Sequence, residues 1–354
     1  MTKLFEPLTL RKIEFRNRLW VSPMCQYSCE NGMPTDWHLV HLGSRAVGGA
    51  GLVFCEATAV SPEGRISPRD LGVWSEAHAA IFQPITRFIK SQGAIAGIQL
   101  AHAGRKASTA PPWQGGKKVA AENGGWQPVA PSALPFADAY PEPRQMTNND
   151  IEKAIDDFRA AAQRSVEAGF EVIEVHAAHG YLCHQFLSPL SNNRTDEFGG
   201  SLQNRLRFPL QVVQAVRETV PSHLPVFVRI SATDWMPGGW DLEQSIVFCN
   251  ALKALGVDLI DVSSGGNVPN AKIPAKPDYQ VPFAAAIRNQ VAIPTAAVGL
   301  ITEPQQADAI LQQGEADAIL VGRQFLRDPY FGLHAERILS AKADLPKQYA
   351  WAIK

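Results

Sequence analysis

The sequence has no long hydrophobic run and almost no net charge. None of its apolar stretches reaches the roughly 20 residues of a transmembrane helix, so we expect no membrane span. Its first residues lack the charged start and the apolar segment of a secretory signal. Lys and Arg number 33 against 34 Asp and Glu, which argues against a protein that binds nucleic acid by neutralising phosphates. These absences predict a soluble, cytoplasmic globular protein with neither nucleic-acid nor membrane partners.

Cysteine is scarce, and its spacing fits no familiar framework. The five cysteines include no Cys-x-x-Cys pair, and their odd number in an expected cytoplasmic chain argues against a set of disulfides. Cysteine-based zinc or iron–sulfur sites have no spacing to support them. We interpret most of the five as small buried hydrophobic residues; they are Cys25, Cys29, Cys55, Cys183 and Cys249.

What the sequence does contain is an alternation of strand-like and helix-like segments. Short apolar runs are followed by amphipathic stretches, and several of these stretches end at glycine, as helices commonly do. Consecutive apolar residues, as in Leu52-Val53-Phe54, are typical of parallel strands covered on both faces. Eight such units predict a (β/α)8 TIM barrel forming one domain over residues 1–354, with an open doubly wound sheet as the alternative. The expected strands are Arg18–Pro23, Gly51–Ala57, Ala94–Leu100, Glu171–His176, Pro225–Ile230, Asp258–Ser263, Ile293–Val298 and Ala316–Val321.

One connection is far longer than the others. Residues 104–148 are rich in Pro, Gly and Trp and separate the third and fourth expected strands. Loops of this length in a compact domain are commonly lids or binding segments. In a barrel this segment follows the carboxyl end of a strand, which is the end where active sites are built. We therefore predict a lid-like insertion over residues 104–148.

Charged and glycine residues stand where the expected strands end. Arg229 lies between apolar residues inside a strand, where an unpaired charge would be prohibitively costly. It must therefore meet either an internal acidic partner or an anionic ligand at the barrel mouth, and its position favours the ligand. Gly299 and the pair Gly322-Arg323 end the last two strands, where many barrels bind phosphate.

His176, His179 and Tyr181 come together at the end of the fourth expected strand. A His-x-x-His pair can ligate zinc, but zinc needs a third protein ligand that this segment does not supply. A structural pair of histidines is a second alternative. We favour a third, in which both imidazoles donate hydrogen bonds to a substrate oxygen and Tyr181 supplies a proton. We therefore expect no metal ligands here.

Six segments of the chain together resemble the Old Yellow Enzyme family, most closely its bacterial class typified by xenobiotic reductase A. The resemblance runs from about residue 4 to about residue 332, in the expected order and spacing. As a combined pattern it is highly specific. The segments are Ser22-Pro23-Met24-Cys25, Glu56-Ala57-Thr58-Ala59-Val60, Gln99 to Lys106, His176 to Leu182, Leu187 to Asp196 and Val321-Gly322-Arg323.

This resemblance implies an FMN-dependent barrel that uses NADPH or NADH to reduce the C=C bond of α,β-unsaturated carbonyl compounds. It implies hydride transfer from flavin N5 to the substrate Cβ and a proton from Tyr181 to Cα. His176 and His179 would bind the carbonyl oxygen with help from Tyr27. Cys25 would lie close to the flavin and the substrate and would tune the redox potential and the affinity. The implied cofactor-binding residues are Ser22, Pro23, Met24, Cys25, Ala57, Gln99, Arg229, Gly299, Gly322 and Arg323.

The resemblance also concerns the end of the chain. In this class the C-terminal tail can reach into a neighbouring subunit's site, in some members with an arginine. This chain has Trp351 where that arginine is expected. We therefore expect a homodimer or homotetramer in which Trp351, in the tail 342–354, walls a neighbour's substrate site. Two other activities stay open: a flavin barrel that oxidises 2-hydroxy acids, and a metal-dependent barrel hydrolase using His176 and His179.

Overall fold

Eight parallel strands close into a barrel in which the last strand pairs with the first. The computed structural model describes residues 2–340 and 345–352. In it β12 pairs with β3 in parallel, so the sheet is closed and the predicted TIM barrel is confirmed. The barrel strands are β3 (Leu19–Val21), β4 (Leu52–Ala59), β5 (Ile95–Ala101), β8 (Val172–Ala177), β9 (Val226–Ser231), β10 (Leu259–Ser263), β11 (Thr295–Ala297) and β12 (Ala318–Val321).

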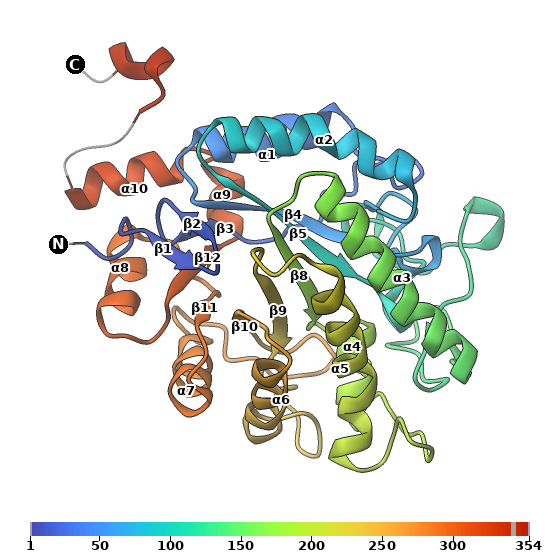
Figure 1. The fold of residues 1–354 in the computed structure, drawn as a ribbon. Helices are drawn as coiled ribbons and strands as arrows, with labels where there is room; N and C mark the ends of the chain where they lie inside the picture. Colours follow the sequence, from blue (N-terminus) through green and yellow to red (C-terminus); the bar gives the residue numbers. More distant parts are fainter. Residues whose placement is uncertain (1, 341–344, 353–354) are drawn as a thin grey trace.

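Helices surround these strands on the outside (Figure 1). Along the chain they alternate with the strands, as the glycine-terminated amphipathic stretches predict, except that two helices follow β8 and two follow β12. The helix Asn148–Glu167 shows how the sequence fixes a helix start. Thr147 Oγ1 accepts a hydrogen bond from Asp150 N, and Asp150 Oδ2 accepts one from Thr147 N, which together form a capping box. The helices are α1 (Asp36–Val47), α2 (Glu76–Ser91), α3 (Asn148–Glu167), α4 (Leu182–Leu187), α5 (Leu202–Thr219), α6 (Leu242–Ala254), α7 (Val281–Val291), α8 (Pro304–Gln312), α9 (Arg323–Arg327) and α10 (Phe331–Ser340).

A short hairpin contributes to the end of the barrel where the strands begin. Strands β1 (Leu8–Leu10) and β2 (Ile13–Phe15) pair in antiparallel fashion before the barrel starts. The last residue of the hairpin, Phe15, is buried, and its ring packs against Trp20 of β3 in a tilted arrangement with centroids 4.8 Å apart. The hairpin therefore adds an aromatic ring to the barrel interior at this end.

Inside the barrel, alternate residues of each strand point inward, and their character changes along the strand. In β9 the residues Phe227 and Arg229 lie two positions apart and share a face. Phe227 packs against the rings of Phe15 and Trp20. Arg229 instead lies opposite Asp261 of β10 and forms an ion pair with it. The barrel interior thus passes from aromatic to charged toward the carboxyl ends of the strands.

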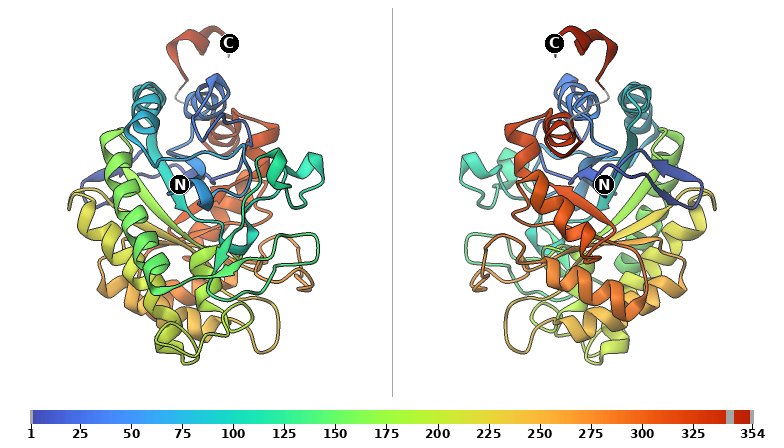
Figure 2. Two further views of the ribbon diagram at one scale, coloured as in Figure 1. Left: turned by 90° about the vertical axis from the view of Figure 1, so that its right-hand side faces the viewer. Right: turned by 90° about the vertical axis from the view of Figure 1, so that its left-hand side faces the viewer.

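The long insertion and the C-terminal tail lie outside the ring of strands and helices. Residues 104–148 carry three short 3-10 turns and a two-stranded sheet, β6 (Val129–Ala130) with β7 (Arg144–Gln145), and part of this segment projects from the side of the molecule (Figure 2). Near the C-terminus, the 3-10 turn η5 (Lys347–Ala352) sits at the edge of the molecule (Figure 1).

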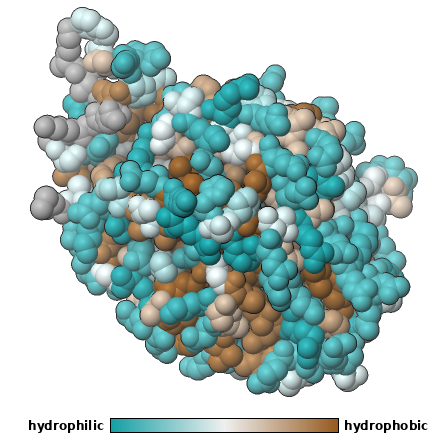
Figure 3. Space-filling model, viewed as in Figure 1, coloured by the Kyte–Doolittle hydropathy of each residue, from teal (hydrophilic) through white to brown (hydrophobic). Residues whose placement is uncertain are grey.

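One face of the molecule shows how hydrophilic and hydrophobic residues are distributed on its surface (Figure 3). Hydrophilic residues cover most of the face seen in Figure 1, with hydrophobic residues gathered in its lower half (Figure 3). Within residues 2–340 and 345–352, no helix has the length and apolar character needed to cross a bilayer.

Candidate active site

The loop after β3 brings five of the expected residues, Ser22 to Cys25 and Tyr27, to the carboxyl end of the barrel. Ser22 is buried, and its Oγ accepts a hydrogen bond from Arg229 Nη1 at 3.1 Å. Burial raises the pKa of the Cys25 thiol well above its usual value, so this thiol is protonated at neutral pH. Tyr27 adopts a positive φ of 50° and meets the ring of Trp113, from the insertion, edge-on at 5.5 Å. The loop and the insertion therefore approach each other at the mouth.

A layer of buried charge lies below this loop. The Arg229 Nε atom is 3.1 Å from Asp261 Oδ2, and Gln99 Nε2 donates to Glu174 Oε1 at 2.8 Å. Burial raises the pKa of Asp261 to about 6, although Arg229 opposes the shift. Burial, followed by the charge of Asp261, also raises the pKa of Glu174. One arginine thus compensates two carboxyl groups whose charged forms are disfavoured.

Arg229 has the internal acidic partner that was one of the two expectations from its sequence context. It has an internal acidic partner, Asp261, and it also reaches Ser22 at the mouth. A guanidinium has five N–H donors. Among the described residues it donates one hydrogen bond, from Nη1 to Ser22, while Nε faces Asp261 in the ion pair. This leaves donors for an acceptor bound above it.

His176, His179 and Tyr181 stand together at the end of β8. The ring centroid of His176 is 5.2 Å from that of His179 and 4.8 Å from that of Tyr181, and both contacts are edge-on. His176 Nδ1 accepts a hydrogen bond from Ala178 N, which leaves Nε2 to carry the ring hydrogen. His179 Nε2 lies 2.7 Å from Ser263 Oγ. Burial, then the charge of Arg229, lowers the pKa of both imidazoles, so they are neutral donors at pH 7.

The expected phosphate residues also converge. Gly299, Gly322 and Arg323 line one pocket of about 90 Å³ at the ends of β11 and β12, together with Arg327. Gly322 also faces the loop after β3, because a Cβ added to it would lie 3.6 Å from Met24 Sδ. Ala57 lies opposite Gln99 in the register between β4 and β5. The structure thus arranges Ser22 to Cys25, Ala57, Gln99, Arg229 and the glycine pocket around one end of the barrel.

Trp351 is not placed with these residues in its own chain. It belongs to η5 and is 77% exposed. The neighbouring tail residue Tyr349 shares a hydrogen bond between hydroxyl groups with Tyr330, and Leu345, Tyr349 and Ala352 line a hollow with α10. Part of the tail 342–354, namely 342–344 and 353–354, lies outside the described residues.

Lys106 is a functional candidate that the sequence did not single out. Its Nζ donates to His179 O and Gly266 O, each at 3.0 Å, and lies 5.4 Å from the centre of the Tyr181 ring. Burial lowers its pKa to about 8. Lys106 stood inside one of the motifs of the family resemblance, but nothing in the sequence indicated that it joins the loops after β8 and β10.

A buried histidine–carboxylate pair supports the loop that carries Cys25 and Tyr27. His38 Nδ1 accepts a hydrogen bond from Thr35 N, so Nε2 carries the hydrogen and faces Glu56 Oε1 at 3.0 Å. Glu56 in turn accepts a hydrogen bond from Gln26 N, inside the loop. Cys29 is the third member of this cluster, with Sγ 3.5 Å from His38 Nε2. The occupied ring nitrogens identify a hydrogen-bond network that fixes the loop.

A second pair of the same kind supports the loop after β8. His184 Nδ1 accepts from Gly180 N at 3.0 Å, and His184 Nε2 lies 3.0 Å from Asp234 Oδ1. Burial alone would raise the pKa of Asp234, but His184, Ser188 and the Trp240 amide together lower it. The pair holds a strained turn, because His179 and Gly180 both have positive φ, 55° and 72°.

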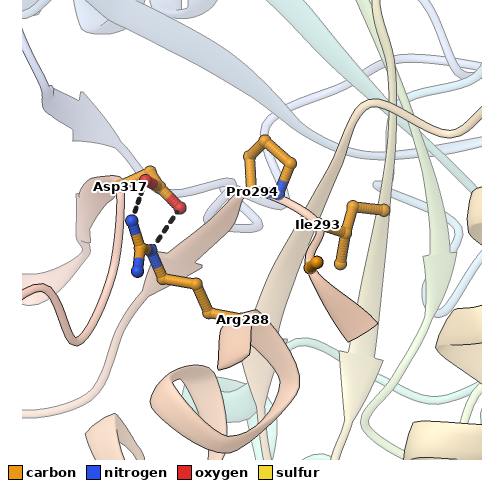
Figure 4. A pocket seen from close by; sticks show the side chains of 5 residues that line it. Arg288, Ile293, Pro294 and Asp317 are labelled. Atoms are coloured by element: carbon orange, nitrogen blue, oxygen red, sulfur yellow. Dashed lines mark hydrogen bonds and ion pairs between the residues drawn. The ribbon is translucent and has the colours of Figure 1, made fainter. Parts of the chain in front are cut away.

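The opposite end of the barrel carries a surface hollow of a different kind. Arg288 and Asp317 form an ion pair at its wall, with Arg288 Nε 2.9 Å from Asp317 Oδ2 (Figure 4). Ala292, Ile293 and Pro294 complete its lining. Among the residues that the structure describes, no histidine, tyrosine or cysteine lines this hollow, in contrast to the mouth.

Comparison with known proteins gives concordant matches over nearly the whole chain. The model of the family described as NADH:flavin oxidoreductase / NADH oxidase matches residues 3–341. An NADPH dehydrogenase of Geobacillus thermodenitrificans is 47% identical over 350 residues, covering 98% of each chain. The solved structure of an old yellow enzyme homologue from Zymomonas mobilis has a TM-score of 0.82 at 27% identity, covering 98% of this chain and 96% of that one. A 2-naphthoyl-CoA reductase complex has a TM-score of 0.86 at 27% identity over 96% of this chain, which spans only 52% of that one.

Proposed function

The chain belongs to the NADH:flavin oxidoreductase / NADH oxidase family of FMN-dependent NAD(P)H oxidoreductases, and we propose that it is an ene-reductase acting on α,β-unsaturated carbonyl compounds. One observation carries the proposal: two neutral imidazoles and a phenol meet at the carboxyl end of β8, beside a layer of buried charge that includes Arg229. This arrangement suits a substrate oxygen that becomes negative and a carbon that takes up a proton.

The residues at the mouth fit FMN in two respects. The Nη2 group of Arg229 has no hydrogen-bond partner among the described residues and could donate to an electronegative edge, while Ser22 and Asp261 hold the guanidinium in place. The pocket of Gly299, Gly322, Arg323 and Arg327 offers two guanidinium groups to a phosphate. Bound FMN would supply the redox chemistry, accepting a hydride from NADPH or NADH and delivering it to the substrate Cβ.

His176 and His179 would bind the substrate carbonyl oxygen. Their lowered pKa keeps both rings neutral, and Ala178 N fixes the His176 tautomer so that Nε2–H can donate. Charge develops on the carbonyl oxygen as the hydride arrives, and preorganised donors act most strongly at that moment. Cys25 and Tyr27 would line the same site from the β3 loop, and Trp113 would bring the insertion over it as a lid.

Tyr181 would give the proton to Cα. Burial raises the pKa of its phenol well above the usual value, so the group is protonated at neutral pH. Its ring lies against His176, which would bind the same substrate. The positions of the two side chains would thus couple substrate binding to proton delivery.

The proposal also covers the location of the protein, its oligomeric state and the contact made by Trp351. We expect a cytoplasmic homodimer or homotetramer, in which the exposed Trp351 contributes to the substrate site of a neighbouring subunit. Its 77% exposure within its own chain is compatible with such a contact. Size determination in solution, with Trp351→Ala compared with the unaltered protein, tests this part.

The experiment that tests the function is an anaerobic flavin titration. The purified protein should be yellow, NADPH should bleach its flavin absorption, and 2-cyclohexenone should restore it. Tyr181→Phe should leave bleaching by NADPH nearly intact and slow the restoration, by a factor in the range of about 100 to 10,000 typical of a general acid. His176→Ala should weaken the charge-transfer binding of phenols. A colourless protein that cannot be reconstituted with FMN would refute the proposal, as would reduced flavin that no enone reoxidises.

A further inference from the structure

A small cavity lies beside Tyr181, away from the phosphate pocket. It is lined by Tyr181 and Asp70 together with Arg65 and short residues of β4, β5 and the segments that follow them. It leaves about 10 Å³ for the centre of a water molecule, close to the smallest volume that holds one water. The residues that line it include Ala57, Ala59, Gly64, Ile66, Ala101 and Ala103.

Asp70 lines this cavity and has a carboxyl oxygen to which no described residue donates a hydrogen bond. The side chain is 1% exposed. Its Oδ2 accepts hydrogen bonds from Ile66 N at 2.7 Å and Ser67 N at 3.0 Å. Among the described residues, Oδ1 has no hydrogen-bond partner. A buried oxygen without a partner is costly, and a bridging water in the cavity would satisfy it.

The charges around Asp70 favour its protonated form. Burial, followed by the negative charge of Glu56, raises its pKa to about 8, while Arg65 and the two amides act in the opposite direction. Asp70 itself contributes to raising the pKa of Cys25, Tyr27 and Tyr181. At pH 7 the group is therefore a neutral acid held next to the proposed proton donor.

We propose that Asp70 is a proton-relay residue that returns to Tyr181, through one water in this cavity, the proton that Tyr181 gives to the substrate. The inference rests on the proposed function. In each turnover the Tyr181 O–H bond breaks and the Cα–H bond forms. The phenolate then takes a proton from the water, the water takes one from the Asp70 carboxyl group, and the carboxylate takes one from solvent.

The surroundings of Asp70 provide a route for that last step. The turn that ends at Asp70 borders both the small cavity and a larger groove. Ser67, Pro68 and Arg69 line this groove on the other side, together with residues of the insertion, and its volume is about 530 Å³. Of these residues Arg69 is exposed and Pro68 is half-buried, whereas Ser67 is buried. Asp70 itself lines the small cavity together with Tyr181. The proposed relay would pass from the groove, past the turn 66–70, to the small cavity.

A purely structural role for Asp70 is the competing explanation, and one substitution separates the two. In Asp70→Asn the side-chain oxygen can still accept from Ile66 N and Ser67 N, but the amide cannot donate a transferable proton. Ser67→Ala is the matched control. It removes the hydroxyl that accepts from Arg69 N in the same turn and leaves the Asp70 carboxyl group in place.

The test combines half-reaction kinetics with infrared spectroscopy. In Asp70→Asn, NADPH should bleach the flavin at the rate of the unaltered protein, while steady-state enone reduction should fall at least about tenfold. The unaltered protein should lose enone turnover as the pH rises through about 8, because Asp70 then gives up its proton. The variant should lack that fall. The carboxylic acid C=O band of Asp70 should disappear from the difference spectrum of the variant, and Ser67→Ala should retain band and turnover.

Two results would overturn the relay. One is enone turnover in Asp70→Asn equal to that of the unaltered protein; the other is a slowed variant with no carboxylic acid band assigned to Asp70. If Asp70→Asn does not fold, the unaltered protein labelled with ¹³C-aspartate decides: a labelled acid band lost between pH 7 and pH 9.5 supports the relay, and its absence refutes it. An unaltered protein whose reduced flavin no enone reoxidises would instead refute the proposed function.

Discussion

At the end of the barrel where the strands begin, the interior holds aromatic rings; at the end where they finish, it holds an arginine, two carboxyl groups and an amide. The rings touch one another at centroid distances between 4.8 and 6.3 Å. The polar groups are as deeply buried, yet several of their atoms have no hydrogen-bond partner among the described residues. The first set is Phe15, Trp20, Phe54 and Phe227, and the second is Gln99, Glu174, Arg229 and Asp261.

The difference shows which end serves the fold and which serves the chemistry. Burying aromatic surface stabilises the barrel, whereas burying an ion pair costs desolvation that its attraction need not recover. Proteins retain such costly groups chiefly where they act. The buried ion pair of Arg229 and Asp261 lies below the mouth, and Arg229 is opposite His176 in the strand register, so the cost of desolvation arises next to the site.

The largest effect should follow from opening the aromatic end. Phe227→Ala removes a ring that contacts Phe15, Trp20 and Phe54, and it should lower the free energy of unfolding by about 3–5 kcal/mol. Urea unfolding monitored by circular dichroism measures the change. Flavin bound per folded molecule should stay constant, because the ring lies two residues before Arg229. Phe227→Leu, the matched control, should cost less than the alanine variant. If the alanine variant lost flavin without losing stability, the aromatic end could not be the part of the barrel that serves the fold alone.

At the charged end, removing Arg229 should produce a smaller loss of stability that depends on pH. The folded pKa of Asp261 is about 6, above the 3.8 of a free aspartate, so the folded state binds the extra proton between these values. This group therefore favours folding below pH 4 and loses about 3 kcal/mol of that advantage as the pH rises through 6.

Arg229→Met should move that loss to higher pH, because Arg229 lowers the pKa of both Asp261 and Glu174. Neutral carboxyl groups left without partners cost about 1–3 kcal/mol. Unfolding measured at pH 6 and pH 8 should show a larger difference in the free energy of unfolding between the variant and the unaltered protein at pH 8. The affinity for flavin should fall at both pH values. Equal losses at the two pH values would show that Arg229 does not control these carboxyl groups.

A subtler change at the mouth should affect turnover more than folding. In His184→Gln the amide can still reach Asp234, but Gly180 N loses its acceptor, so the strained turn at His179 loosens. The loss of one buried hydrogen bond should cost about 1 kcal/mol of stability. Enone reduction should slow while NADPH still bleaches the flavin.

His184→Asn reverses the change and serves as the matched control. Its side-chain oxygen can accept from Gly180 N, while Asp234 loses its histidine partner. It should therefore lose stability with little loss of turnover. Identical behaviour of the two variants would mean that the Gly180 contact does not position His179.

The two ends also differed in how well the sequence predicted them. Strands and core followed from apolar runs, and the strand expected over Ile293–Val298 is shortened to Thr295–Ala297 next to Pro294, which cannot donate to the ladder. Arg229 was conspicuous as a charge among apolar residues. Asp261 carried the same signal, between Ile260 and Val262, but only the register between β9 and β10 identifies it as the partner.

Other parts of the mouth depend on contacts that no local pattern reveals. His184 and Asp234 are 50 residues apart, and Asp70 meets Tyr181 only across a cavity. Lys106 was visible in a motif, but its bonds to two distant carbonyl groups were not. The family resemblance supplied the residues expected to touch flavin and substrate. It did not supply those that hold them in place.

The smallest effect should come from charge at the strand-start end, where the ion pair is exposed to solvent. Arg288 meets Asp317 through two nitrogen–oxygen contacts, and Asp317 Oδ2 also accepts from Thr295 N (Figure 4). The side chains are 35% and 19% exposed, so water screens the attraction. Arg288→Ala should therefore lower the free energy of unfolding by at most about 1 kcal/mol. Flavin content and enone turnover should not change, since no residue of the mouth contacts this pair. Urea unfolding at low and high salt measures the effect. A loss comparable to that of Arg229→Met would mean that burial is not what separates the charges of the two ends.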